Sequence, residues 1–158
     1  MKSFEYEVGV EWTGNDGSGT STPKFGRDAE ISSANKPTII GSAPREFGGD
    51  GMNWAPEDLF VAAVGQCHML TYLYLCARAG IVVESYTDHP VGTLDVEGAT
   101  VAQFRKVELR PAVVISKGDP DAAMALHEDA HNGCYVGRSV KAEVNITPTV
   151  SFVGAATQ

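Results

Sequence analysis

Two cysteines stand in settings that suggest thiol chemistry. Cys67 lies in the middle of the only long apolar segment of helical character, which begins at Pro56. Cys134 follows an Asn-Gly pair that is expected to end a second helix, so it stands at the start of a new turn. Free backbone N–H groups at a helix start favour a thiolate. The two residues therefore suggest an attacking thiol and a second thiol that resolves the oxidised product.

Each cysteine also has a purely structural interpretation. Free cysteine is among the most buried residue types, so Cys67 can be a small apolar residue of a packed helix and Cys134 a packing residue at a helix boundary. Cys76 has apolar neighbours and is interpreted as structural. A reactive thiol needs positive surroundings. The candidate cation for Cys67 is Arg45, in the loop before the helix, although an exposed loop arginine is the commoner case.

Histidines near the two cysteines raise the alternative of a metal site. The histidines are His68, His127 and His131. His131 and Cys134 have ligand-like spacing, and Cys67 with His68 would add further ligands. Adjacent residues of a helix face different directions, however, and no paired C-x-x-C motif is present. The sequence also lacks a lysine-bearing phosphate loop and a G-x-S-x-G nucleophile motif. We therefore predict no metal ligands and no cofactor.

Composition limits the possible partners. The chain has 158 residues, 43% of them apolar, and a net charge of -8 from 20 acidic and 12 basic residues. Such a charge disfavours nucleic acid and anionic membranes as partners. No signal-peptide core and no uninterrupted apolar run of ~18 residues is present. Three cysteines without an export signal fit a reducing compartment. We predict a single cytoplasmic domain.

The hydrophobic pattern predicts an α+β fold. N-terminal strands occupy 1–42, a glycine-rich loop 43–55, a central helix 56–79, and C-terminal strands with a second helix 81–153. Within these regions we expect strands at 4–12, 20–25, 29–33, 38–41, 81–87, 91–97, 104–116 and 140–152, and the second helix at 119–131. The central helix is apolar on nearly every side, so a second subunit is expected to cover part of it.

Several segments together carry a family resemblance. They are Arg45-Glu46-Phe47-Gly48-Gly49, Pro56-Glu57-Asp58-Leu59-Phe60-Val61-Ala62-Ala63, Cys67, Asn132-Gly133-Cys134 and Val140-Lys141-Ala142-Glu143. In this order and over nearly the whole chain, they resemble the OsmC/Ohr family, the osmotically inducible and organic-hydroperoxide-resistance proteins. The resemblance is nearer the OsmC branch, because no arginine stands between Gly14 and Gly19.

The resemblance implies a fold and an activity. The fold is an intertwined α+β homodimer, with antiparallel sheets around a long buried central helix and a second helix. The activity is a cysteine-based peroxidase for organic hydroperoxides, in which Cys67 attacks the peroxide and Cys134 resolves the sulfenic acid as a Cys67–Cys134 disulfide. Glu57 orients Arg45, and a dithiol or thiol-protein reductant restores the thiols. The chain departs from the family's pattern in two residues inserted before Pro56, and in Tyr135, where proline is usual.

The chemistry of these residue types agrees with the resemblance. Arginine stays charged and offers five donors, so it can hold a thiolate and a peroxide oxygen together, and a carboxylate can fix its planar fork. An apolar collar for an alkyl peroxide is expected from Phe47, Met52, Trp54 and Phe60. Two alternatives remain: a non-catalytic small-molecule binding protein of the same fold, and a metal-binding protein that uses cysteine and histidine.

Overall fold

The structure is a computed structural model that describes residues 1–98 and 101–154. The chain divides into two compact units, Met1–Leu59 (unit 1) and Phe60–Gln158 (unit 2). The first turn of helix α1 (Pro56–Arg78) belongs to unit 1, and the rest of this helix belongs to unit 2. A single domain over the whole chain stays a prediction.

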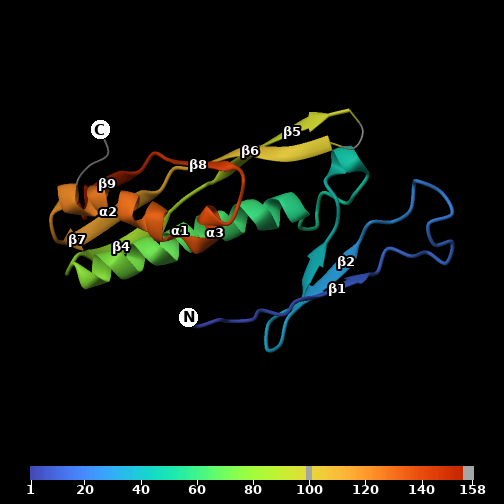
Figure 1. Ribbon diagram of the computed structural model, residues 1–158, viewed down its shortest axis with the longest axis horizontal. Helices are drawn as coiled ribbons and strands as arrows, with labels where there is room; N and C mark the ends of the chain where they lie inside the picture. Colours follow the sequence, from blue (N-terminus) through green and yellow to red (C-terminus); the bar gives the residue numbers. More distant parts are fainter. Residues whose placement is uncertain (99–100, 155–158) are drawn as a thin grey trace. The chain divides into compact units, whose positions relative to one another are not determined.

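Unit 1 is built on a small antiparallel sheet. Its strands, in the order β1-β2-β3, are β1 (Gly9–Trp12), β2 (Ala29–Ser32) and β3 (Ile39–Gly41) (Figure 1). The predicted first strand is too long, because β2 offers only four residues and pairs with Gly9–Trp12 alone. No strand forms at 20–25, which was also predicted. The predicted loop contains one short 3-10 helix, η1 (Arg45–Phe47).

Helix α1 has the predicted bounds, for reasons visible at both ends. Pro56 is its first residue, where a missing N–H costs nothing. Asp58 caps the start, since its Oδ2 accepts a hydrogen bond from the Ala55 N–H at 3.0 Å. The helix ends at Arg78, and Gly80 follows with φ 72°, a left-handed conformation that suits glycine.

Unit 2 contains two three-stranded sheets and three helical segments. The sheets are β4-β7-β9 and β5-β6-β8. Their strands are β4 (Val82–Thr87), β5 (Val91–Glu97), β6 (Val101–Leu109), β7 (Ala112–Lys117), β8 (Glu143–Ile146) and β9 (Thr149–Phe152). The other helices are α2 (Pro120–Gly133) and α3 (Tyr135–Arg138). The α+β class is confirmed.

Both sheets of unit 2 contain parallel as well as antiparallel strand pairs, which corrects the prediction of antiparallel sheets. Strand β8 runs parallel to β6, and β9 runs parallel to β7. The segments 104–116 and 140–152, each predicted as one strand, are both broken into two. The breaks fall at Pro111 and Pro148, which lack the N–H that a ladder needs. The two breaks lie next to each other, because the Thr149 N–H donates a hydrogen bond to the Pro111 carbonyl oxygen at 2.8 Å.

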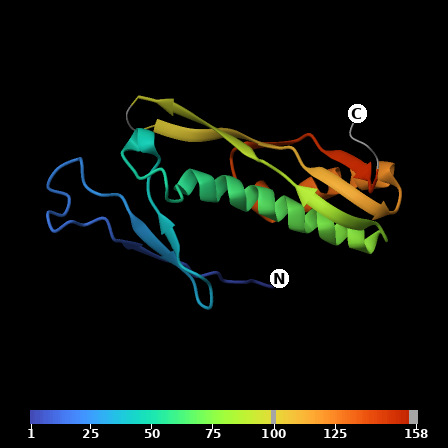
Figure 2. The same cartoon turned by 180° about the vertical axis from the view of Figure 1, so that it is seen from behind.

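Both sheets of unit 2 pack along α1, one after the other (Figure 2). The first half of the helix contacts β6, β8 and α3 in one apolar cluster that includes Val64 and Leu109. The second half contacts β4, β7, β9 and α2 in another cluster, which includes Tyr72 and Ile115. The helix thus carries two cores, and Cys67 lies between them in sequence.

Part of α1 remains uncovered in the single chain. Leu70 and Tyr74 are 55% and 60% exposed, and they follow Ala62 and Gln66 along one exposed stripe of the helix. In the single chain the helix is therefore buried on one side only. The sequence pattern predicted a helix that is apolar on nearly every side and partly covered by a second subunit. Its length and a mean hydropathy of 1.5 would also allow it to cross a membrane, but core helices of soluble proteins meet the same criterion.

Candidate functional site

Unit 2 brings the two predicted cysteines together. Cys67 is on α1, and Cys134 sits between α2 and α3, at the end of one and the start of the other. Only 9% of Cys67 and 3% of Cys134 is exposed. The two thiols are near enough for Cys67 to raise the pKa of Cys134. All three cysteines are free thiols, and Cys76 is buried in the core near Tyr72. A redox pair is therefore geometrically available.

Cys134 stands at a helix start, as predicted, but the expected effect on its ionisation is wrong. Its Sγ accepts a hydrogen bond from the Gly137 N–H at 3.3 Å, which favours the thiolate. Burial and the neighbouring Cys67 thiol act in the opposite direction and dominate, so the pKa of Cys134 is raised. Cys134 therefore keeps its proton at neutral pH, which suits a resolving thiol better than an attacking one.

The end of α2 approaches α1 closely beside the thiols. A Cβ on Gly133 would lie 3.1 Å from Cγ2 of Thr71, so a larger residue would require the Thr71 side chain to shift by a few tenths of an ångström. The Thr71 hydroxyl in turn donates to the Cys67 carbonyl oxygen at 2.9 Å. Gly133 therefore allows Cys134 to reach α1.

The charged residues predicted for the site lie in unit 1 and are not paired with each other there. Arg45 is exposed in η1, and its side chain covers Gly51 so closely that a Cβ on Gly51 would overlap it. Glu57 is half-buried, and its Oε2 is fully buried without a hydrogen-bond partner among the described residues. No ion pair joins Arg45 to Glu57 in the described part of the chain.

A second arginine, Arg27, was missed in the sequence. Its guanidinium donates hydrogen bonds to the carbonyl oxygens of Phe25 at 2.9 Å, Pro23 at 3.0 Å and Gly48 at 3.4 Å. It also lies 4.6 Å from the centre of the Phe25 ring. Arg27 is thus held rigidly against the glycine-rich loop. Its place directly after Gly26, in the turn that leads into β2, was a signal that could have found it.

The apolar collar is not assembled as one surface within either unit. Phe47, Met52 and Trp54 are 43%, 83% and 52% exposed on the loop of unit 1. Phe60 belongs to the core of unit 2, where its ring stacks on Phe104 with 4.5 Å between centroids. The collar stays a prediction.

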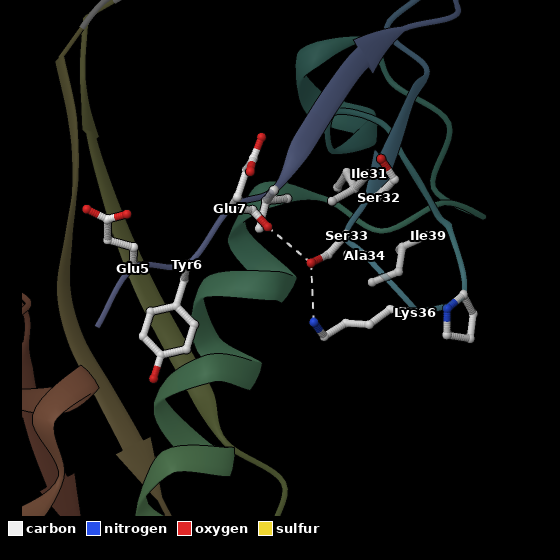
Figure 3. Close-up of a pocket in the computed structure, with 11 residues that line it drawn as sticks. Glu5, Tyr6, Glu7, Ile31, Ser32, Ser33, Ala34, Lys36 and Ile39 are labelled. Atoms are coloured by element: carbon white, nitrogen blue, oxygen red, sulfur yellow. Dashed lines mark hydrogen bonds between the residues drawn. The ribbon is translucent and has the colours of Figure 1, made fainter. Parts of the chain in front are cut away.

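Unit 1 also carries an open groove of about 490 Å³ (Figure 3). The groove lies between the N-terminal segment, around Tyr6, and the turn that joins β2 to β3. Ser33 links the two sides, because its hydroxyl donates to the Glu7 carbonyl oxygen at 3.0 Å and accepts from Lys36 Nζ at 3.2 Å. Glu5 and Glu7 are the carboxylates beside it, and no histidine or cysteine lines it.

Metal ligands do not converge in the described residues. No group of three or more histidine, cysteine or acidic side chains is placed to hold a metal ion there. The histidines that suggested the metal alternative make other contacts: His68 and His127 contact each other inside unit 2.

The comparisons with known proteins agree with this fold. The family model described as OsmC-like protein matches residues 48–149. The chain belongs to the OsmC-like protein family. The resemblance seen in the sequence is thereby confirmed, while the preference for the OsmC branch stays a prediction.

Relatives of this family extend over most of the chain. A Vibrio cholerae structure described as an OsmC-like protein of unknown function is 30% identical, with a TM-score of 0.84 over 93% of this chain and 100% of that one. Bacillus subtilis YmaD, an uncharacterised protein, is 28% identical over 73% of this chain and 79% of its own. An Elizabethkingia anophelis organic hydroperoxide resistance protein shares the fold, with 22% identity and a TM-score of 0.66 over 96% and 99% of the two chains.

Proposed function

We propose that the protein is a cysteine-based peroxidase that reduces organic hydroperoxides. The observation that carries the proposal is that Cys67 and Cys134 are both buried free thiols of unit 2, near enough for one to shift the pKa of the other. Family membership and fold neighbours named organic hydroperoxide resistance proteins support it.

The chemistry has two steps. The Cys67 thiolate attacks the distal oxygen of a hydroperoxide, breaks the O–O bond and becomes a sulfenic acid, while the alkoxide takes up a proton and leaves as an alcohol. The Cys134 sulfur then attacks the Cys67 sulfur; the hydroxyl leaves with the Cys134 proton as water, and a disulfide forms. A dithiol or thiol-protein reductant returns both thiols.

Arginine is the group that activates Cys67 in this proposal. Arg45 is the first candidate, with Glu57 as the carboxylate that orients it, and Arg27 is a second candidate that the fold already holds in place. Glu57 and Cys67 are ten positions apart on one helix, which is roughly 15 Å along its axis. That distance is too long for an arginine bound to Glu57 to reach Cys67 of the same chain.

A homodimer resolves this distance. The uncovered stripe of α1 is apolar at Leu70 and Tyr74, and one face of the N-terminal segment is also uncovered. That face carries Phe4, Tyr6, Val8, Val10 and Trp12. If two copies of α1 pack antiparallel about a two-fold axis, Glu57 of one copy approaches Cys67 of the other. The active site is then shared between subunits.

Thiol titration before and after one equivalent of cumene hydroperoxide tests the proposal. We expect two thiols per chain to disappear and to return with dithiothreitol. The apolar side chains of the loop favour alkyl peroxides over hydrogen peroxide, because each extra buried methylene contributes ~0.8 kcal/mol. Unchanged thiols would reject the peroxidase. They would leave the alternative of a small-molecule binding protein with inert thiols, which the burial of both sulfurs favours.

A further inference from the structure

Two buried histidines hold helices α1 and α2 together. His68 of α1 and His127 of α2, here called the histidine pair, are 1% and 3% exposed. Nε2 of His68 lies 3.1 Å from Nδ1 of His127, and the two rings are nearly parallel, at 12°. The His127 ring also stacks on Tyr72, with 3.8 Å between centroids.

This contact is a costly way to join two helices. The outer nitrogens, Nδ1 of His68 and Nε2 of His127, are buried without a hydrogen-bond partner among the described residues. Burial lowers the pKa of each histidine to about 4, so both are neutral at physiological pH and one must donate to the other. Two apolar side chains would fill the same space without unsatisfied nitrogens. A buried polar contact of this kind needs an explanation beyond stability.

The histidine pair lies beside the thiols. His68 directly follows Cys67, and His127 precedes Cys134 by seven residues, about two turns of helix. The contact of Thr71 with Gly133 lies on the same seam between α1 and α2. A directional hydrogen bond at this place restricts how far α2 can slide or turn against α1, and Cys134 directly follows the last residue of α2.

We propose that the histidine pair positions Cys134 against Cys67 and so sets how readily the two thiols form a disulfide. His68 and His127 are positioning residues that act through the helices and do not touch the substrate. This inference deepens the proposed function, because it concerns the same thiol site, but it is testable without any peroxide.

The test measures the dithiol–disulfide equilibrium of the full-length protein against glutathione. Cys67 and Cys134 give up two electrons and two protons to one glutathione disulfide, which yields the protein disulfide and two glutathione thiols. Cys76→Ser is present in every variant so that only one pair of thiols reacts. The free energy of unfolding by urea is measured on the same samples.

The variants separate the hydrogen bond from the packing. His127→Asn places an amide where Nδ1 stood and keeps the contact with His68, whereas His127→Gln places it where Nε2 stood and loses the contact. The double variant His68→Leu with His127→Leu removes all polar atoms and leaves an apolar seam. His131→Asn, one turn further along α2 and outside the pair, is the control.

We expect the equilibrium constant of His127→Asn and His131→Asn to stay within about threefold of the parent. His127→Gln and the double leucine variant should shift tenfold or more toward the dithiol, about 30 mV for a two-electron couple. The double leucine variant should unfold no more easily than the parent, so its shift cannot come from instability. An unshifted equilibrium in this variant, or equal shifts for His127→Asn and His127→Gln, would overturn the proposal.

The same measurement separates this proposal from the peroxidase. Normal disulfide formation with glutathione but no peroxide consumption would reject the peroxidase alone. Peroxide turnover together with an unshifted double leucine variant would reject the positioning role alone. Failure of the parent protein to form the Cys67–Cys134 disulfide at any glutathione ratio would overturn both.

Discussion

The two units of this chain differ in how fully each one forms its share of the proposed site. In unit 2 the thiols are buried near each other, on a helix that packs into two apolar cores. In unit 1 the charged groups are present but unmatched: Arg45 is exposed, and a buried oxygen of Glu57 lacks a partner. The sulfur pair thus lies within one unit, whereas the activation that we propose for it requires a contact that unit 1 does not make within itself.

The largest effect is expected from the thiols themselves. Cys67→Ser should abolish peroxide reduction, because no other thiol of unit 2 is placed to attack in its stead. Cys134→Ser should consume about one equivalent of peroxide and then stall as a sulfenic acid that oxidises further. Mass spectrometry of the oxidised protein and a peroxide-consumption assay measure both. Cys76→Ser is the matched control and should turn over normally; full turnover by Cys67→Ser would break the assignment.

The next largest effect concerns unit 1. Arg45→Ala should lower kcat/KM for an organic hydroperoxide roughly a hundredfold, the usual loss when one charged donor to a developing anion is removed. Arg105→Ala is the control, because Arg105 pairs with Asp95 on the exposed surface of unit 2. Arg27→Ala tests the second candidate: a larger loss there than at Arg45 would assign the activating role to Arg27.

Mixed dimers test whether the missing contact comes from a second copy. Inactive Arg45→Ala subunits combined with inactive Cys67→Ser subunits should recover activity, because one of the two sites in each heterodimer has both residues intact. The expected recovery is about half of the parental activity per heterodimer, measured after subunit exchange. A heterodimer as inactive as its parents would show that each chain completes its own site, and so would an active monomer.

The smallest effect is on the stability of unit 2 in acid. Folding lowers the pKa of both His68 and His127 from 6.5 to about 4, and burial is the main cause for each. The nearby His131 adds to the shift of His68, and His68 adds to the shift of His127. The unfolded chain therefore binds more protons between these values, so stability is full above pH 6.5 and is lost as the pH falls toward 4. The loss is up to ~3 kcal/mol for each histidine.

Urea unfolding at pH 7, 5.5 and 4.5 measures this loss. The double variant His68→Leu with His127→Leu should flatten the dependence over this range, while His89→Asn, an exposed residue, should leave it unchanged. A parental protein that is equally stable at pH 7 and 4.5 would contradict the prediction.

Local signals explain which parts of the fold were predictable. Helix α1 was found because Pro56, the acidic first turn and Gly80 mark its ends. The first strand was predicted too long because the alternation of apolar and polar residues continues back to Phe4. The length of a strand is set by the strand that it pairs with, and here β2 is short. The break at Pro111 was present in the sequence but was hidden by apolar residues on both sides.

The candidate site was predictable only in part, because its contacts join distant segments. The helix settings of Cys67 and Cys134 suggested a thiol pair, and the family resemblance assigned their roles, but spacing alone does not place Cys134 beside Cys67. The histidine pair was considered only as part of a metal alternative, since a sequence shows residue types but not that two helices bring His68 to His127. Arg27 was missed because its partners are backbone carbonyl oxygens, one of them on the distant Gly48, and such contacts leave no pattern in a sequence.

The parallel pairing of the late strands has a consequence for folding order. Strand β8 joins β6 with Glu143 opposite Lys106, and β9 joins β7 with Thr149 opposite Ala112. Parallel partners need a crossover between them, and here the crossover contains α2, Cys134 and α3. A growing chain therefore cannot close this part of unit 2 until its last strand has been made. The pairing of β8 and β9 therefore waits until the chain has been made through residue 152, well after both cysteines.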